Sequence, residues 1–356
     1  MKIENIDKNF KERQAGEGEK KVYKIPGDQF NLKGCYYDEK YGFIKMDADY
    51  AGKISEGVAW GARCTAGARL LFSTDSDEMS ITAELFKCEM THMPLTGSAG
   101  FTLCECIGNK EIFVSNFCPA FGAEQTFTAH AKLGGGKMKN YILYFPLYSW
   151  VINLSVAFSC GSRVTAFEKY KKDLPVLYYG SSITQGGCAS RPDTCYQARI
   201  GRETNVDFVI HGYSGNAKAE PAMCEFLKEF DCSVFVCDYD HNADSADYLE
   251  KTHLPLYKKF RENPAHKNVP IIFLTKPDGL RDNEGARRAE IIKSTYEYAL
   301  SSGDENVYFI DGRTFYPKNV SEHCAVDGAH PTDLGFYFMA KSLLKVIKNN
   351  NLLKPR

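Results

Sequence analysis

Residues 176–187 read VLYYGSSITQGG and decide the fold of the C-terminal half of the chain. The apolar run 176–179 is typical of a buried strand, and the small residues after it are typical of a sharp turn into a helix. Far downstream, Asp327 and His330 stand three residues apart near the end of the chain. A serine on a strand-to-helix turn, followed later by an Asp and a His, is one of the orders in which proteins assemble a nucleophile, its orienting carboxylate and a base.

Strand and helix patterns alternate over the C-terminal half. The expected strands are 176–180, 206–211, 233–238, 269–275 and 307–310. The expected helices lie near 194–203, 219–230, 244–262, 284–301 and 332–349. This alternation predicts a parallel sheet with helices on both of its faces.

The N-terminal half has a different pattern, because short runs of mixed apolar and polar residues replace the helical periodicity. Residues 79–85 alternate almost strictly, and the polar residues 74–77 form an expected turn before them. Many short strands with few helical stretches predict a β-sandwich domain over residues 1–170, followed by an α/β domain over 171–356. The charged segment 168–173 between the two is expected to be a solvated connector.

The composition excludes several classes of protein. The chain has 356 residues, 44% of them hydrophobic and 25% charged, with a net charge of -1, so nothing favours nucleic acid or an anionic membrane as partner. Residues 1–21 are polar and no apolar run of about 18 residues occurs, so neither a signal peptide nor a membrane span is expected. The thirteen cysteines include no Cys-x-x-Cys pair. They indicate buried reduced thiols in a cytoplasmic protein rather than a disulfide framework or a zinc site.

Polar residues with catalytic chemistry follow the expected strands, and the carboxyl ends of parallel strands meet at one edge of a sheet. The hydroxyl of Ser182 needs a base to become a nucleophile, and His330 is the best candidate, with Asp327 fixing its tautomer. The backbone N–H groups of Ser182 and Gly215 and the side-chain amide of Asn242 are suitable donors to an oxyanion.

Each of these residues also has a structural interpretation. Ser181 competes with Ser182 as nucleophile, and either serine is suited to capping the following helix. Asn242 is suited to capping the helix expected from 244, and Gly215 to a left-handed turn. The combination of serine, aspartate and histidine favours the catalytic interpretation.

The sequence resembles the SGNH (GDSL-type) hydrolase superfamily. Residues 180–186 (GSSITQG) are similar to its first block, Gly-Asp-Ser-Ile-Thr-x-Gly, with Ser in place of Asp, and residues 213–216 (YSGN) are similar to its second. Residues 240–243 (DHNA) stand where the third block has Gly-x-Asn-Asp. Residues 327–330 (DGAH) match the last block, Asp-x-x-His.

The resemblance extends over nearly the whole chain beyond about residue 30. Residues 92–101 and 144–148 are similar to the N-terminal β domain of one branch of the superfamily, although residues 100–104 read GFTLC in place of its Gly-x-Asp-Leu-Tyr motif. The implied fold is a flavodoxin-like three-layer hydrolase domain over 171–356, preceded by a jelly-roll-like β-sandwich over 1–170.

The resemblance also implies the roles of the site residues. Ser182 is expected to be the nucleophile, His330 the base and Asp327 the orienting partner. The oxyanion donors are expected at the N–H groups of Ser182 and Gly215 and at the Asn242 amide. We therefore expect a serine esterase without metal or cofactor that removes short acyl groups, above all O-acetyl groups on carbohydrates.

Two further histidines, His92 and His241, are the expected substrate contacts, although a structural histidine explains His92 equally well. The alternatives to a short-acyl esterase are a lipase or thioesterase for longer chains, and a carbohydrate-binding protein with an inactive hydrolase domain. The expected partner is a small-molecule or oligosaccharide ester, with neither nucleic acid nor membrane. Homo-oligomerisation stays open.

Overall fold

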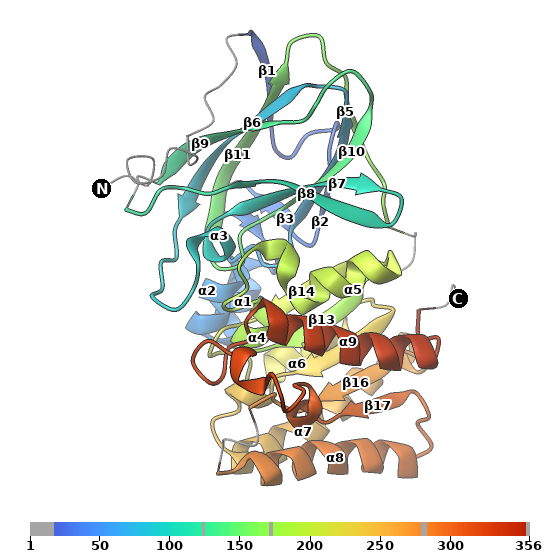
Figure 1. Cartoon of the computed structure of the whole chain (residues 1–356). Helices are drawn as coiled ribbons and strands as arrows, with labels where there is room; N and C mark the ends of the chain where they lie inside the picture. Colours follow the sequence, from blue (N-terminus) through green and yellow to red (C-terminus); the bar gives the residue numbers. More distant parts are fainter. Residues whose placement is uncertain (1–17, 123–124, 171–173, 279–282, 354–356) are drawn as a thin grey trace.

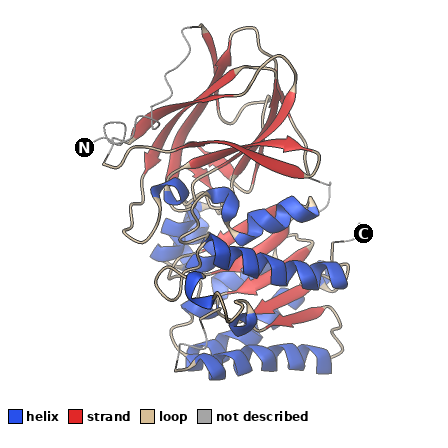
Figure 2. Cartoon of the chain, viewed as in Figure 1, coloured by secondary structure: helices blue, strands red, loops and turns tan. Residues whose placement is uncertain are grey.

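The computed structural model describes residues 18–122, 125–170, 174–278 and 283–353. In this part of the chain, antiparallel sheets in the N-terminal half precede a parallel sheet with helices in the C-terminal half (Figures 1 and 2). This mixed architecture confirms the predicted fold class. None of the described helices is long and apolar enough to cross a membrane.

Two antiparallel sheets face each other in the N-terminal half. The first has the strand order β1-β11-β6-β9, and the second has the order β12-β5-β10-β7-β8, with β2 paired to β5. Their bounds are β1 Lys20–Lys24, β2 Asn31–Lys33, β5 Arg69–Thr74, β6 Glu78–Phe86, β7 Phe101–Ile107, β8 Lys110–Phe117, β9 Thr126–Lys132, β10 Lys139–Tyr144, β11 Trp150–Ser159 and β12 Val164–Ala166. A small hairpin joins β3 (Tyr36–Asp38) to β4 (Gly42–Ile44).

One hydrophobic core lies between the two sheets. Alternate residues of the strands point into it, as in the buried Phe72 of β5, Ile81 of β6 and Val156 of β11. This alternation is the pattern that residues 79–85 show in the sequence. The predicted β-sandwich therefore has the expected inner face, whereas the jelly-roll-like connectivity stays a prediction.

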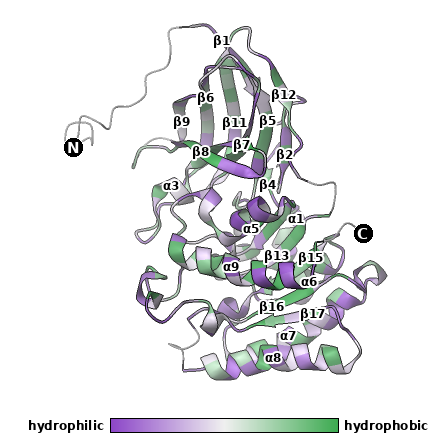
Figure 3. Cartoon of the chain, turned by 45° about the vertical axis from the view of Figure 1, so that its right-hand side comes forward, coloured by the Kyte–Doolittle hydropathy of each residue, from purple (hydrophilic) through white to green (hydrophobic). Residues whose placement is uncertain are grey.

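The parallel sheet has the strand order β14-β13-β15-β16-β17. Strand β14, the second in sequence, is therefore at the edge of the sheet, beside the first strand, β13. Its strands are β13 Val176–Gly180, β14 Phe208–Gly212, β15 Val234–Asp238, β16 Ile271–Leu274 and β17 Val307–Ile310. This is the strand order of flavodoxin-like folds. Strand β16 is coloured as hydrophobic in Figure 3, as expected for a strand that is buried on both faces.

Helices cover both faces of this sheet, as the sequence predicted. Helices α5 (Tyr196–Thr204) and α9 (Asp333–Asn349) pack on the face that carries Tyr178. The helices on the face that carries Tyr179 are α6 Pro221–Lys228, α7 Ala246–Arg261 and α8 Gly285–Ser301.

Two helices of the N-terminal half belong to the core of the parallel sheet. Helices α1 (Ala48–Ile54) and α2 (Glu56–Ala62) bury Ala51, Val58 and Ala62 in the same cluster as the Tyr179 face. The sequence pattern predicted few helices in this half of the chain and placed none of them against the parallel sheet. Their apolar faces meet residues that are more than 100 positions away in sequence, so local periodicity alone does not reveal the contact.

The two halves are joined by further buried contacts. Arg69 of β5 is fully buried and forms an ion pair with Asp207, while its guanidinium lies 3.7 Å from the centre of the Phe208 ring. The predicted domain boundary lies between residues 170 and 171. Residues 171–173 are outside the described ranges, so the boundary itself stays a prediction. The expectation of a solvated connector is wrong for Lys169, because its side chain is buried and forms an ion pair with Glu111.

The carboxyl ends of the three neighbouring strands β14, β13 and β15 lie at one level. Gly180 of β13 is opposite Gly212 of β14 and opposite Asp238 of β15. A Cβ on Gly180 would lie 2.1 Å from Thr184 Oγ1, and a Cβ on Gly212 would lie 2.3 Å from the backbone nitrogen of Gln185. The turn after β13 therefore folds directly onto the strand ends, and only glycine leaves room for it.

Replacement of Gly212 by Ala is expected to lower the free energy of unfolding by about 2–3 kcal/mol, because the new methyl group meets backbone atoms that cannot rotate away. Gly52, on the exposed side of α1, has open space around its Cβ position. Gly52→Ala is therefore expected to be neutral or stabilising by about 0.5–1 kcal/mol. Urea unfolding of both variants checks this, and equal midpoints would show that the strand end tolerates a side chain.

A buried carboxyl lies under the same turn. Asp238 is 4% exposed, and its Oδ2 accepts hydrogen bonds of 2.9 Å from both Thr184 Oγ1 and Tyr196 OH. Burial raises the pKa of Asp238 to about 7, although the two hydrogen bonds act in the opposite direction. The folded protein therefore holds the Asp238 proton more tightly than the unfolded chain does.

This difference predicts a pH-dependent stability. The contribution of Asp238 is fully present below the unfolded pKa of about 3.8 and is lost as the pH rises towards about 7, with a slope of at most about 1.4 kcal/mol per pH unit. Asp238→Asn keeps an acceptor for Thr184 and Tyr196 but cannot ionise. The free energy of unfolding of the wild type should thus fall relative to that of Asp238→Asn over this window. Parallel stability curves for the two proteins would contradict the prediction.

Candidate active site

The first element of the site is the turn between β13 and α4 (Ser182–Gln185). Ser181 is the N-cap of α4, and its Oγ accepts a hydrogen bond of 3.2 Å from the N–H of Ile183. The helix ends at Gly186, which adopts a φ of 98°. Because the Ser181 hydroxyl serves the cap, Ser182 is the serine whose hydroxyl faces the other site residues.

The second element is the segment that precedes α9. His330 Nε2 lies 2.9 Å from Ser182 Oγ, and His330 Nδ1 lies 2.7 Å from Asp327 Oδ2. The other carboxylate oxygen of Asp327 accepts hydrogen bonds from the N–H groups of Ala329, at 3.1 Å, and His330, at 2.8 Å. The structure thus brings the three predicted residues into one continuous hydrogen-bonded relay.

The environment of Asp327 keeps its carboxylate ionised. Partial burial acts to raise its pKa, but the hydrogen bonds from the backbone and the imidazole of His330 outweigh burial and hold the pKa well below its usual range. An ionised Asp327 fixes the proton of the imidazole on Nδ1 and leaves the lone pair of Nε2 towards Ser182.

Gly215 and Asn242 lie on loops that follow the two strands beside β13. The N–H groups of Ser182 and Gly215 meet no acceptor among the described residues, and Gly215 has a φ of +71° in open surroundings. The Oδ1 atom of Asn242 accepts a hydrogen bond of 3.3 Å from the N–H of Ala217, which joins the two loops. The alternative role of Asn242 as a helix cap is removed, because Ser245 caps α7.

The N-terminal half reaches the relay through two side chains. The ring of His92 lies 5.4 Å from that of His330, centre to centre. Tyr148 is fully buried and its hydroxyl donates a hydrogen bond of 3.1 Å to the carbonyl oxygen of Ser182. Sequence reasoning proposed His92 but missed Tyr148, whose only signal was its place in the segment 144–148 that resembles the N-terminal domain.

His241 has an acidic partner outside the relay. Its Nε2 is 3.1 Å from Asp278 Oδ1, and no contact joins it to Ser182, Asp327 or His330 among the described residues. Burial acts to lower the pKa of His241, but the partnership with Asp278 outweighs burial and raises it. The role of His241 as a substrate contact stays a prediction.

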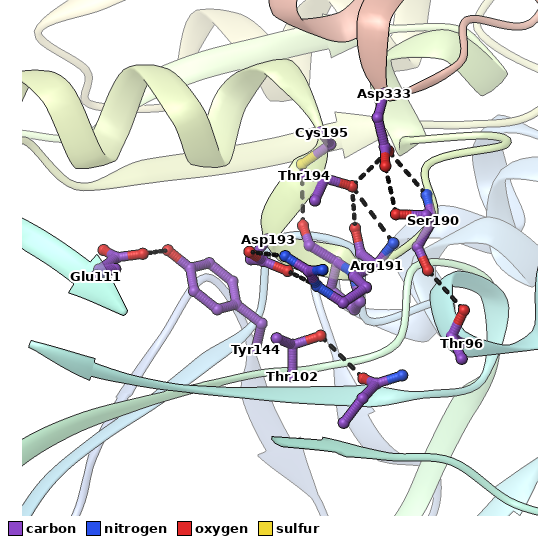
Figure 4. Close-up of polar contacts among 12 residues, drawn as sticks. Thr96, Thr102, Glu111, Tyr144, Ser190, Arg191, Asp193, Thr194, Cys195 and Asp333 are labelled. Carbon is purple, nitrogen blue, oxygen red and sulfur yellow. Dashed lines mark hydrogen bonds and ion pairs between the residues drawn. The ribbon is translucent and has the colours of Figure 1, made fainter. Parts of the chain in front are cut away.

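A polar network that the sequence analysis missed holds the loop after α4. The carboxylate of Asp333, at the start of α9, accepts hydrogen bonds from the Ser190 N–H at 2.9 Å and from Thr194 Oγ1 at 2.7 Å (Figure 4). Thr96 Oγ1 donates to the Ser190 carbonyl at 2.6 Å from the N-terminal half. The loop is thereby anchored to the helix that directly follows His330. No pattern in the sequence pairs these positions.

Both halves of the chain match known protein families. Residues 173–348 match the GDSL-like lipase/acylhydrolase family, and residues 23–164 match the N-terminal domain of SGNH-hydrolase-type esterases. No curated protein matches the sequence.

Solved structures share the arrangement over nearly the full chain. A protein from Bacteroides ovatus described as a GDSL-like lipase is 25% identical, with a TM-score of 0.81, and the match covers 92% of this chain and 98% of that one. A salicylyl-acyltransferase of a tetracycline biosynthetic pathway is 16% identical, with a TM-score of 0.76 and coverages of 95% and 99%. An acetyl xylan esterase from Butyrivibrio proteoclasticus is 12% identical, with a TM-score of 0.59 and coverages of 94% and 100%.

The family matches cover both halves of the chain, and the strand order, the nucleophile turn and the Asp-x-x-His segment are those that the resemblance implied. The chain belongs to the SGNH (GDSL-type) hydrolase superfamily, in the branch that carries an N-terminal β domain before the hydrolase domain.

Proposed function

We propose that this protein is a serine esterase that hydrolyses short acyl esters, with O-acetyl groups on carbohydrates as its substrates. The observation that carries the proposal is the relay in which Ser182 Oγ, His330 Nε2, His330 Nδ1 and Asp327 Oδ2 are joined by contacts of 2.9 and 2.7 Å. Both distances are within hydrogen-bond reach for a nucleophile, its base and the group that orients the base.

The chemistry follows from these positions. Ser182 Oγ attacks the ester carbonyl while its proton moves to His330 Nε2, and Asp327 stabilises the imidazolium that forms. The negative charge on the former carbonyl oxygen is held by the N–H groups of Ser182 and Gly215 and by the Asn242 amide. His330 then protonates the leaving alcohol. In the second half it takes a proton from water, which releases the acid and restores Ser182.

The close packing around the nucleophile favours a small acyl group. Ser182 is only 6% exposed. A Cβ on the adjacent Gly187 would lie 2.9 Å from Tyr148 OH and 3.2 Å from His330 Cδ2, so little free space remains on that side. A substrate that presents only a small acyl group to Ser182 fits this surface better than one with a long apolar chain.

The carbohydrate part of the proposal draws on the fold. The structural neighbours include the acetyl xylan esterase and a family two carbohydrate esterase from Clostridium thermocellum in complex with cellohexaose. Together with the intact relay, this likeness favours an active deacetylase over a carbohydrate-binding protein without activity. His92, beside His330, is proposed to contact the leaving alcohol.

Ser182→Ala is expected to reduce the kcat for p-nitrophenyl acetate by at least about 10⁴-fold, because no other group replaces the nucleophile. The wild type should hydrolyse acetate faster than butyrate, and butyrate faster than octanoate. Ser181→Ala is the matched control. It removes the cap, which costs about 1 kcal/mol of stability, but should retain most of the activity. Activity that survives in Ser182→Ala would contradict the assignment, and a preference for octanoate would favour the lipase or thioesterase.

Asp327→Asn is expected to lower the kcat by about 10³–10⁴-fold with little change in KM, because an amide stabilises the wrong tautomer of the imidazole. The comparison variant is Asp278→Asn, which removes the acidic partner of His241 and leaves the three relay residues unchanged. Steady-state kinetics on an acetylated oligosaccharide should show a kcat effect for the first variant only. A KM effect of Asp278→Asn would place His241 at the rim of the substrate site, and equal kcat losses would argue against the special role of Asp327.

A further inference from the structure

Three potential metal ligands meet beside the relay. One ring nitrogen of His92, the Sγ atom of Cys188 and one ring nitrogen of His330 all lie within 4.8 Å of one another. They come from three separate segments: the loop before α3 (Leu95–Ser98), the loop after α4 and the segment before α9. Cys188 has no role in the proposed mechanism.

The backbone holds Cys188 in an unusual conformation. Its φ is +70°, a region that residues with a Cβ rarely adopt. The next turn of the loop is anchored by Ser190, which bonds to Asp333 on one side and to Thr96 on the other (Figure 4). Such outliers persist when the surrounding structure enforces them, and they concentrate at functional sites.

The thiol of Cys188 has no hydrogen-bond partner among the described residues. It is 6% exposed, and burial raises its pKa to about 12. A buried protonated thiol is a poor target for oxidants. These properties argue against a redox role, whereas a divalent metal can displace the thiol proton and bind the sulfur.

The donor set selects a particular class of ion. Two imidazoles and a thiolate suit Zn²⁺ and similar borderline ions better than Mg²⁺ or Ca²⁺, which prefer oxygen ligands. Zn–N bonds of about 2.0–2.1 Å and a Zn–S bond of about 2.3 Å place tetrahedral donors roughly 3.3–3.6 Å apart. Side-chain rotations that move the donor atoms by about 1 Å would therefore bring them to bonding distance of one ion. A water molecule would occupy the fourth position.

The partner of His330 already meets a requirement of metal sites. A histidine that binds a metal through one nitrogen commonly donates the other N–H to a carboxylate, which fixes the ring. Asp327 Oδ2 lies 2.7 Å from His330 Nδ1, so Nε2 is the nitrogen left for the ion. The same carboxylate adds a negative charge near the cluster.

We propose that His92, Cys188 and His330 form an inhibitory binding site for Zn²⁺ or a similar thiophilic divalent ion. On binding, two N–Zn bonds and one S–Zn bond form, the thiol proton is released to solvent, and no atom changes its oxidation state. The lone pair of His330 Nε2 then belongs to the metal and cannot accept the proton of Ser182. The inhibition rests on the proposed esterase function, whereas the metal site itself does not.

The test uses the full-length protein after treatment with a chelator. Addition of Co²⁺ should produce a thiolate-to-cobalt charge-transfer band together with tetrahedral d–d bands, and Zn²⁺ should displace the Co²⁺. Zn²⁺ should also inhibit hydrolysis of p-nitrophenyl acetate reversibly, with recovery on addition of chelator. For each variant, the inhibition is expressed relative to its own metal-free rate.

Cys188→Ser should abolish the charge-transfer band and raise the zinc concentration for half-inhibition by at least about tenfold. Cys160→Ser is the matched control, because Cys160 is an exposed free cysteine of the N-terminal half and should leave both readouts as in the wild type. His92→Ala should weaken Co²⁺ binding as well.

The proposal is overturned if the cobalt band survives in Cys188→Ser, or if zinc inhibits that variant as strongly as it inhibits the wild type. The cobalt spectrum keeps the two proposals separate. A cobalt band that depends on Cys188, in a protein without activity on any ester, would support the metal site while rejecting the esterase. Esterase activity in a protein that shows no such cobalt band would support the esterase and reject the metal site.

Discussion

The site depends on the common level at which β13, β14 and β15 end. Gly180 and Gly212 have no side chains there, so the turn that carries Ser182 packs against the strand ends at distances that a methyl group would forbid. Asp238 closes the same space from β15 by bonding to Thr184. The position of the nucleophile is therefore set by backbone contacts, which are much stiffer than contacts between flexible side chains.

The N-terminal half is a structural part of the site rather than an appendage. Its helices α1 and α2 complete one face of the parallel sheet. Tyr148 bonds to the carbonyl of Ser182, and His92 lies beside His330. Arg69 is fully buried between the halves, where an unpaired charge would be strongly destabilising. The nucleophile turn is thus packed between the parallel sheet below it and the β domain above it.

The environment of His330 serves both of the activities proposed for it. A base and a metal ligand need the same thing, an imidazole with a free lone pair on one nitrogen and a carboxylate on the other. Asp327 creates that state. Because one lone pair cannot bind a proton and a metal at once, catalysis and metal binding exclude each other at this residue. Cys188, which catalysis does not use, is what distinguishes the metal site from the relay.

The sequence by itself determined the class of fold and the members of the relay. Periodicity is a local property of the sequence, so the alternating residues in 79–85 predicted the antiparallel sheets and the strand–helix alternation after 176 predicted the parallel sheet. The short motifs around Ser182 and His330 predicted the nucleophile and its base. The family resemblance already selected Ser182 over Ser181, and the tertiary structure gives the physical reason, because the Ser181 hydroxyl caps α4 while the Ser182 hydroxyl lies 2.9 Å from His330 Nε2.

The tertiary structure alone also brought in Tyr148, Asp333 and Cys188 and buried Lys169. Each of these contacts joins segments far apart in the chain. No short-range pattern encodes such a contact, since it arises only when the two halves pack against each other and exclude water between them.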